Sequence, residues 1–170
     1  MSPHRGFTPA LTRLADGAQW ALAVLLVLLM SVMVVDVTWQ VASRFLLHAP
    51  SSFTEELAGF LLIWIGLLGA AYGFRTRAHL GIDLLVSRLG GRAGRLAEVI
   101  AHALVALFAF TTLILGGIRL VQLAFELEQI SAAMGVRMGF VYLALPLSGL
   151  LIIVFSAESM AKVVASGGEA

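Results

Sequence analysis

Apolar residues are gathered into four long stretches along this chain, at residues 17–35, 57–74, 99–118 and 138–157. Each stretch has 18 to 20 residues, and a helix rising about 1.5 Å per residue then matches a hydrocarbon core of about 30 Å. None of them alternates apolar and polar residues as a barrel strand does. The pattern therefore predicts four membrane-spanning α-helices joined by short loops.

Composition strengthens this interpretation and excludes several classes of protein. Of the 170 residues, 60% are hydrophobic and only 12% are charged, whereas soluble domains have about 25% charged residues. Disordered chains are polar and rich in charge, so disorder is excluded too. The absence of cysteine removes disulfides, zinc thiolates, iron–sulfur clusters and cysteine nucleophiles. The predicted fold class is an all-α integral membrane protein.

The basic residues predict how the four helices are oriented. Eight of the 11 lysines and arginines lie in the tails 1–16 and 158–170 and in the loop 75–98, and three lie on the opposite side. The positive-inside rule then places both termini in the cytoplasm, as four spans require. The first apolar stretch is longer than a signal-peptide core, so we expect an uncleaved span. The chain is therefore expected to cross its membrane several times.

Residues 82–98, between the second and third spans, combine apolar positions at helical spacing with arginines. This mixture predicts a short interfacial helix interrupted at Gly90-Gly91. Arg88, Arg92 and Arg95 are expected to contact anionic phospholipid headgroups. The net charge of +1 offers no bulk attraction to nucleic acid, which is not expected as a partner.

Charged residues on the predicted outer side admit two interpretations. Glu55 and Glu56 open the second span, where a helix dipole favours carboxylates. Adjacent helical positions point about 100° apart, so the two glutamates cannot share one environment, and one of them can pair with Arg44. Asp36, near the outer end of the first span, is expected either to bind a cation or proton, or to reach the headgroups or Arg44.

Arg75, His79 and Asp83 recur at i, i+4 and i+8 on the predicted inner side. On a continuing helix they share one face, which predicts a tether at the membrane surface or, more weakly, a proton relay or metal site. One histidine and one aspartate are an incomplete ligand set for zinc or iron. His102 is the one histidine within the spans, and bis-histidine haem would need a second. We therefore expect no catalytic, cofactor or metal residues, and a cross-helix hydrogen bond from His102.

Small residues form two spaced pairs in the second span, at Gly66/Ala70 and Gly69/Gly73. Pairs of this kind let helix backbones approach closely. They are explained either by packing within the bundle or by docking of another membrane protein.

Known catalytic signatures are missing from the chain. It has no Walker lysine loop, nucleophile elbow or HExxH motif. No span centre carries an acidic residue with a basic partner. An enzyme is therefore not expected. A small independent four-span transporter or channel, working as a homodimer, remains an alternative, although that class needs an intramembrane carboxylate for coupling.

The ordered set of motifs resembles the DctQ-like small membrane subunit of tripartite ATP-independent periplasmic (TRAP) transporters, over roughly residues 15–160. The residues that carry the resemblance are Arg44-Phe45, the acidic pair in 52–56, the tryptophan–glycine segment 64–70, the histidine–aspartate motif in 75–83, and the segments 129–131 and 142–149. Two family prolines are replaced by Ala132 and Arg137, which bears on the rigidity of the outer loop.

The resemblance implies a non-catalytic role in transport, in a multi-pass protein of a bacterial inner membrane. A larger multi-span permease would hold the sodium and substrate sites, and a periplasmic solute-binding protein would deliver an organic acid. The small subunit would brace the moving permease. In this interpretation Arg44, Glu55 and Glu56 form outer ion pairs, and Arg75, His79 and Asp83 form the inner tether.

Overall fold

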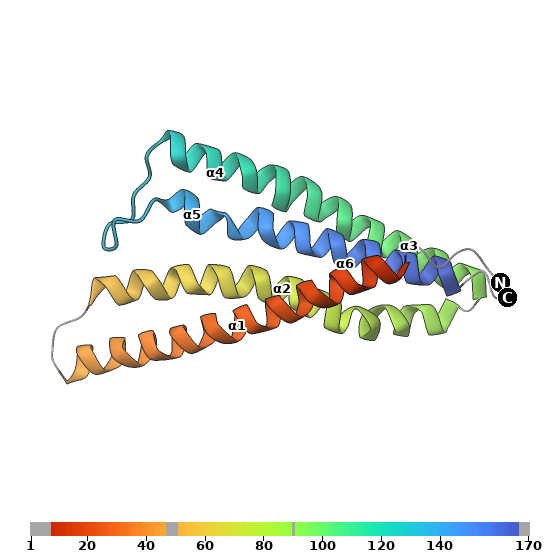
Figure 1. Ribbon diagram of the computed structural model, residues 1–170, viewed down its shortest axis with the longest axis horizontal. Helices are drawn as coiled ribbons and strands as arrows, with labels where there is room; N and C mark the ends of the chain where they lie inside the picture. Colours follow the sequence, from red (N-terminus) through yellow and green to blue (C-terminus); the bar gives the residue numbers. More distant parts are fainter. Residues whose placement is uncertain (1–7, 47–50, 90, 167–170) are drawn as a thin grey trace.

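The computed structural model describes residues 8–46, 51–89 and 91–166, with side chains described for 11–46, 51–76 and 93–165. The described chain is almost entirely helical (Figure 1). Its elements are α1 (Thr8–Phe45), α2 (Ser52–Leu89), α3 (Gly91–Phe108), the π-helix η1 (Ala109–Gly116), α4 (Gly117–Glu126), α5 (Met138–Tyr142) and α6 (Ala144–Ser166). The predicted all-helical class is confirmed.

Four helical segments are long and apolar enough to cross a membrane: Leu11–Phe45, Ser52–Thr76, Ala93–Glu126 and Met138–Ala165. Each contains one of the four predicted stretches, so the structure has four long apolar helices that are consistent with four membrane spans. The first and third segments have 35 and 34 residues, well above the roughly 20 that span a bilayer upright. Helices of this length must tilt or extend beyond the hydrocarbon.

The third span is a composite of α3, η1 and α4, which follow one another without a loop. The π-helical turns lie against α6 at Gly149, where an added Cβ would lie 2.8 Å from Leu113 Cβ and 3.2 Å from the Ala109 carbonyl oxygen. The glycine therefore lets α6 approach the backbone of η1 directly.

The fourth span is divided into α5 and α6 at Leu143. Pro146 lies in the first turn of α6 and has no N–H to donate to the Tyr142 carbonyl, which explains the interruption at that point. The sequence predicted a single helix over 138–157, and the structure corrects that detail.

The two ends of the bundle differ in their connections (Figure 1). At one end, here called the termini end, the start of α1, the end of α2, the start of α3 and the end of α6 lie together. At the other, the hairpin end, lie the end of α1, the start of α2 and the loop 127–137. This arrangement agrees with an even number of spans.

The buried core lies where α1, α2 and α6 meet, toward the termini end. Its buried members are Ala15, Leu22, Leu68, Ala71 and Phe155. Most other large apolar side chains of α1 are exposed, so the helices bury little of their apolar surface within this chain. That surface is free to contact lipid or another membrane protein.

The prediction of a separate short helix between spans two and three is wrong. The structure continues α2 without a break to Leu89 and begins α3 at Gly91. Arg88 therefore belongs to α2, and Arg92 and Arg95 to α3. The predicted interruption at Gly90-Gly91 falls on the junction, of which residue 90 lies outside the described residues.

Candidate functional site

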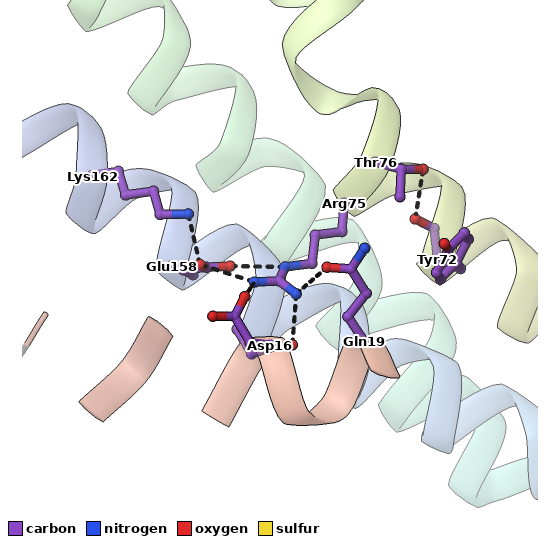
Figure 2. Close-up of polar contacts among 8 residues, drawn as sticks. Asp16, Gln19, Tyr72, Arg75, Thr76, Glu158 and Lys162 are labelled. Atoms are coloured by element: carbon purple, nitrogen blue, oxygen red, sulfur yellow. Dashed lines mark hydrogen bonds and ion pairs between the residues drawn. The ribbon is translucent and has the colours of Figure 1, made fainter. Parts of the chain in front are cut away.

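Arg75 of α2 is the centre of a charged cluster at the termini end, formed with Asp16, Gln19, Glu158 and Lys162 (Figure 2). The cluster joins three helices, because Asp16 and Gln19 lie on α1 and Glu158 and Lys162 lie on α6. We call it the termini-end cluster.

All five N–H donors of the Arg75 guanidinium are used. Nε and Nη2 donate to the two carboxylate oxygens of Glu158, at 3.0 and 3.1 Å. Nη2 also donates to Asp16 Oδ1 at 2.6 Å, while Nη1 donates to the Ala15 carbonyl at 2.7 Å and to Gln19 Oε1. Such a forked pair is among the stronger charge-assisted hydrogen bonds in proteins.

The charges of the cluster balance although its centre is buried. The Glu158 side chain is 3% exposed and that of Arg75 is 10% exposed. Lys162 Nζ lies 2.7 Å from Glu158 Oε1, so two cations face the two carboxylates of Asp16 and Glu158. The guanidinium also lies 5.2 Å from the ring centroid of Phe155. The arrangement holds helices together and leaves no donor of the guanidinium for a ligand.

The sequence interpretation found Arg75 but missed its partners. It paired Arg75 with His79 and Asp83, whose side chains lie outside the described residues. It assigned Asp16 and Glu158 to the tails 1–16 and 158–170, and in the structure they belong to the long helices α1 and α6. The i,i+4 spacing of Glu158 and Lys162 is the signal that could have extended the fourth helix beyond residue 157.

Glu56 organises the hairpin end. Its Oε2 accepts hydrogen bonds from the backbone N–H groups of Ala133 and Met134, at 2.9 and 2.8 Å, and Oε1 accepts one from Ala132 at 3.2 Å. Successive N–H groups that converge in this way form an anion-binding concavity. The carboxylate therefore fastens the loop between α4 and α5 onto the start of α2.

The loop itself is a tight hairpin. Ser131 N–H donates to the Val136 carbonyl and Met138 N–H to that of Gln129, and Gly135 supplies a φ of +67° that favours glycine. Ala132 is one of the two positions where the resemblance noted from the sequence would place a proline, and a proline there would have no N–H to donate to Glu56. The three backbone N–H groups that donate to Glu56 thus hold a loop that has no proline.

The two neighbouring glutamates serve different partners, as their 100° separation predicts. Glu55 Oε1 lies 2.7 Å from Arg44 Nη2, and both side chains are about half exposed. Asp36 is only 7% exposed, and its Oδ2 has no hydrogen-bond partner among the described residues. Arg44 bonds to Glu55 and not to Asp36, so the alternative that paired Asp36 with Arg44 is wrong. Its contact with headgroups stays a prediction.

The glycines of the second span do not serve packing within the chain. An added Cβ at Gly66, Gly69 or Gly73 would meet nothing within 4 Å, and Ala70 is exposed. Packing inside the bundle is therefore the wrong explanation for these residues. The close approaches occur instead at Gly117, Gly139 and Gly149, where each glycine faces a side chain of a neighbouring element.

The remaining candidate residues do not form a ligand site in the described part of the chain. His102 is buried, with its ring edge-to-face against Phe74 at 5.8 Å. No group of three metal-ligating side chains occurs among the residues described. The side chains of Arg88 and Arg92 lie outside that set, and Arg95 is half-buried in α3.

The sequence of the chain matches a family of transport proteins. Residues 33–166 match the family model described as tripartite ATP-independent periplasmic transporters, DctQ component. The match covers most of the four-span region, including both glutamates of the hairpin end and the termini-end residues Arg75 and Glu158.

Individual relatives point the same way. The chain is 28% identical over 125 residues to the sialic acid TRAP transporter small permease protein SiaQ of Vibrio cholerae, covering 74% of this chain and 70% of the relative. It is 33% identical over 99 residues to the C4-dicarboxylate small permease protein DctQ of Rhodobacter capsulatus, covering 58% and 43%. The isethionate TRAP transporter permease protein DctMQ of Oleidesulfovibrio alaskensis is 28% identical over 118 residues, which are 66% of this chain but 18% of that relative.

Proposed function

We propose a role that proceeds from one premise: the chain belongs to the DctQ component family of tripartite ATP-independent periplasmic transporters and is a small permease subunit. Membership of a transporter permease family also excludes an enzyme. From this premise, the chain acts as a rigid brace for a large multi-span permease, which itself binds and moves the solute.

The observation that supports the proposal is that charged side chains connect the helices at both ends of the bundle. The ion pairs of Arg75 with Asp16 and with the buried Glu158 join α1, α2 and α6, and Glu56 joins α2 to the loop before α5. Both ends of the bundle are thereby fixed. The faces between them are apolar and largely exposed, which suits a subunit covered by lipid and by a protein partner.

Finer features of the transport cycle also belong to this proposal. The partner permease holds the sodium sites, and a periplasmic solute-binding protein delivers an organic acid. Relatives are named for sialic acid, C4-dicarboxylates and isethionate, each an organic anion at neutral pH. The match to the isethionate permease protein covers only 18% of that protein, so most of that longer permease chain lies outside the matched part. This supports a close association of the present chain with a larger permease. The hairpin end faces the periplasm, and Arg88, Arg92 and Arg95 contact phospholipid at the inner surface.

A mild-detergent pull-down of the tagged chain from its native membrane tests the brace. We expect a large multi-span permease in stoichiometric amount, identified by mass spectrometry. A homodimer without any permease would contradict the proposal and favour the independent four-span transporter.

Uptake measurements provide a second test of the same role. Glu56→Ala is expected to lower uptake while the preference between substrates stays unchanged, because the implied substrate site lies on the other subunit. A change in substrate preference would contradict a bracing role.

A further inference from the structure

Asp36 is a buried carboxylate with an unused acceptor in the outer half of the hydrophobic span of α1. Its side chain is 7% exposed, and Oδ2 finds no donor among the described residues. The nearest basic candidate along the helix, Arg44, is bonded to Glu55 instead. A buried polar atom without a partner is destabilising, and acidic residues inside spans usually face a partner or a cavity.

The carboxylate lines an open groove of about 440 Å³ on the surface of α1 and α2. The other lining residues are Ser31, Val32, Val35, Trp39 and Leu57. The Ser31 hydroxyl already donates to the Val27 carbonyl, so it has no proton left for Asp36. Oδ2 has almost no accessible surface in the isolated chain, so a donor in the groove binds the carboxylate once the side chain turns toward it. A second apolar groove of about 510 Å³ shares Ser31 and extends along α1 to Leu26. Together they run over residues 26–39, about 20 Å of helix, which is the scale of a packed helix.

The unused acceptor restricts what can cover this groove. An acyl chain has no hydrogen-bond donor, and Asp36 lies nine residues from Phe45, about 13 Å along the helix from its end. A second copy of this chain packed through the same groove would bring two carboxylates together, which is unfavourable. A helix of a different protein can supply the donor that is missing.

We propose that the groove seats one transmembrane helix of the large permease, and that a hydrogen-bond donor on that helix binds Asp36. The inference rests on the proposed function, since it requires that partner. It assigns Asp36 to recognition of the partner and the surrounding valines and tryptophan to apolar contact.

Replacing the carboxylate separates recognition from structural support. Asp36→Leu keeps the branched shape and the number of side-chain heavy atoms, and it is expected to reduce recovery of the permease in the pull-down roughly tenfold, because the donor on the partner is left unpaired. The isolated variant should melt at the same temperature as the wild type or higher, because an unpaired buried carboxylate has been removed. Thr38→Leu is the matched control and should leave recovery of the permease unchanged. Thr38 is exposed and lies two positions after Asp36, on a different face of α1. A lower melting temperature, or unchanged recovery, for Asp36→Leu would overturn the proposal.

Cross-linking locates the partner directly. The chain has no cysteine, so Val35→Cys places a single thiol in the groove at a position 70% exposed. A maleimide photo-cross-linker there should capture the large permease. Capture of a second copy of this chain, or no capture while the permease still copurifies, overturns the groove but leaves the brace intact. Failure of the wild-type chain to copurify any permease would instead overturn the proposed function itself.

Discussion

At the residue scale, the two arginine–glutamate pairs of this chain differ chiefly in burial. Arg44 and Glu55 are 56% and 47% exposed, whereas Arg75 and Glu158 are 10% and 3% exposed. Exposed pairs contribute little because water screens them. Loss of one partner from a buried pair leaves an uncompensated charge, which is strongly destabilising. The termini-end cluster therefore governs stability far more than the Arg44–Glu55 pair.

Arg75→Ala is expected to lower the free energy of unfolding by about 3 kcal/mol, because Glu158 would stay buried with only Lys162 to compensate it. Thermal unfolding of the purified chain in detergent measures this loss. Arg44→Ala is the control and should change stability by less than about 1 kcal/mol. Equal effects of the two substitutions would show that the cluster does not support the helices.

Glu56→Ala is expected to free the loop 127–137, because three backbone N–H groups lose their acceptor. Hydrogen exchange at the amides of Ala132, Ala133 and Met134 should accelerate by roughly tenfold or more, while the core amides keep their rates. Glu55→Ala removes the neighbouring carboxylate, which makes no bond to the loop, and should leave those amides protected.

At the element scale, glycine is used differently on the two sides of the bundle. Gly149 lets α6 lie against η1, and an added Cβ would meet Leu113 Cβ, an atom that no rotamer change can move. The glycines of α2 whose surroundings the structure describes, Gly59, Gly66, Gly69 and Gly73, face open space. Gly149 therefore fixes how α6 and η1 pack. The glycines of α2 are available for contact with lipid or with another protein.

Gly149→Ala is expected to destabilise the chain by about 1–3 kcal/mol through overpacking against η1. Gly66→Ala is the same substitution at a position that faces open space. It should be neutral or stabilising by up to about 1 kcal/mol, because alanine has a higher helix propensity than glycine. Melting temperatures of the two variants in detergent compare them. A larger loss at Gly66 would mean that α2 packs differently from the structure described.

At the scale of the whole molecule, the chain is held at both ends and open along its sides. The first and third spans, with 35 and 34 residues, exceed the bilayer thickness and are expected to lie tilted in it. Interactions at the two ends fix the helices relative to one another, so that the tilt is shared by the bundle. This is the mechanical property that a brace requires.

The orientation predicted from the arginines can be measured with single cysteines, since the chain has none. Ala133→Cys in the hairpin-end loop and Ala93→Cys at the termini end are both at exposed positions. With both termini cytoplasmic, a membrane-impermeant maleimide should label Ala133→Cys in cells whose outer membrane alone has been made permeable. Ala93→Cys should react only after the inner membrane is disrupted, and the reverse pattern would invert the orientation.

The sequence by itself determined the all-helical class and the presence of four long apolar helices. These follow from local rules, because length and apolar content decide whether a helix can span. The adjacent positions of Glu55 and Glu56 also sufficed to predict that they face different surroundings. Family membership followed from motifs of the same local kind.

Only the tertiary structure decided the partners of these charges. Arg75 bonds to residues 59 and 83 positions away in the chain, and Glu56 to backbone groups 76 to 78 positions away. Local periodicity carries no information about such distances, and backbone N–H donors leave no trace in the residue types. For the same reason, the sequence could not predict which glycines pack closely or that Asp36 Oδ2 has no hydrogen-bond partner among the described residues. Both depend on which helix faces the residue.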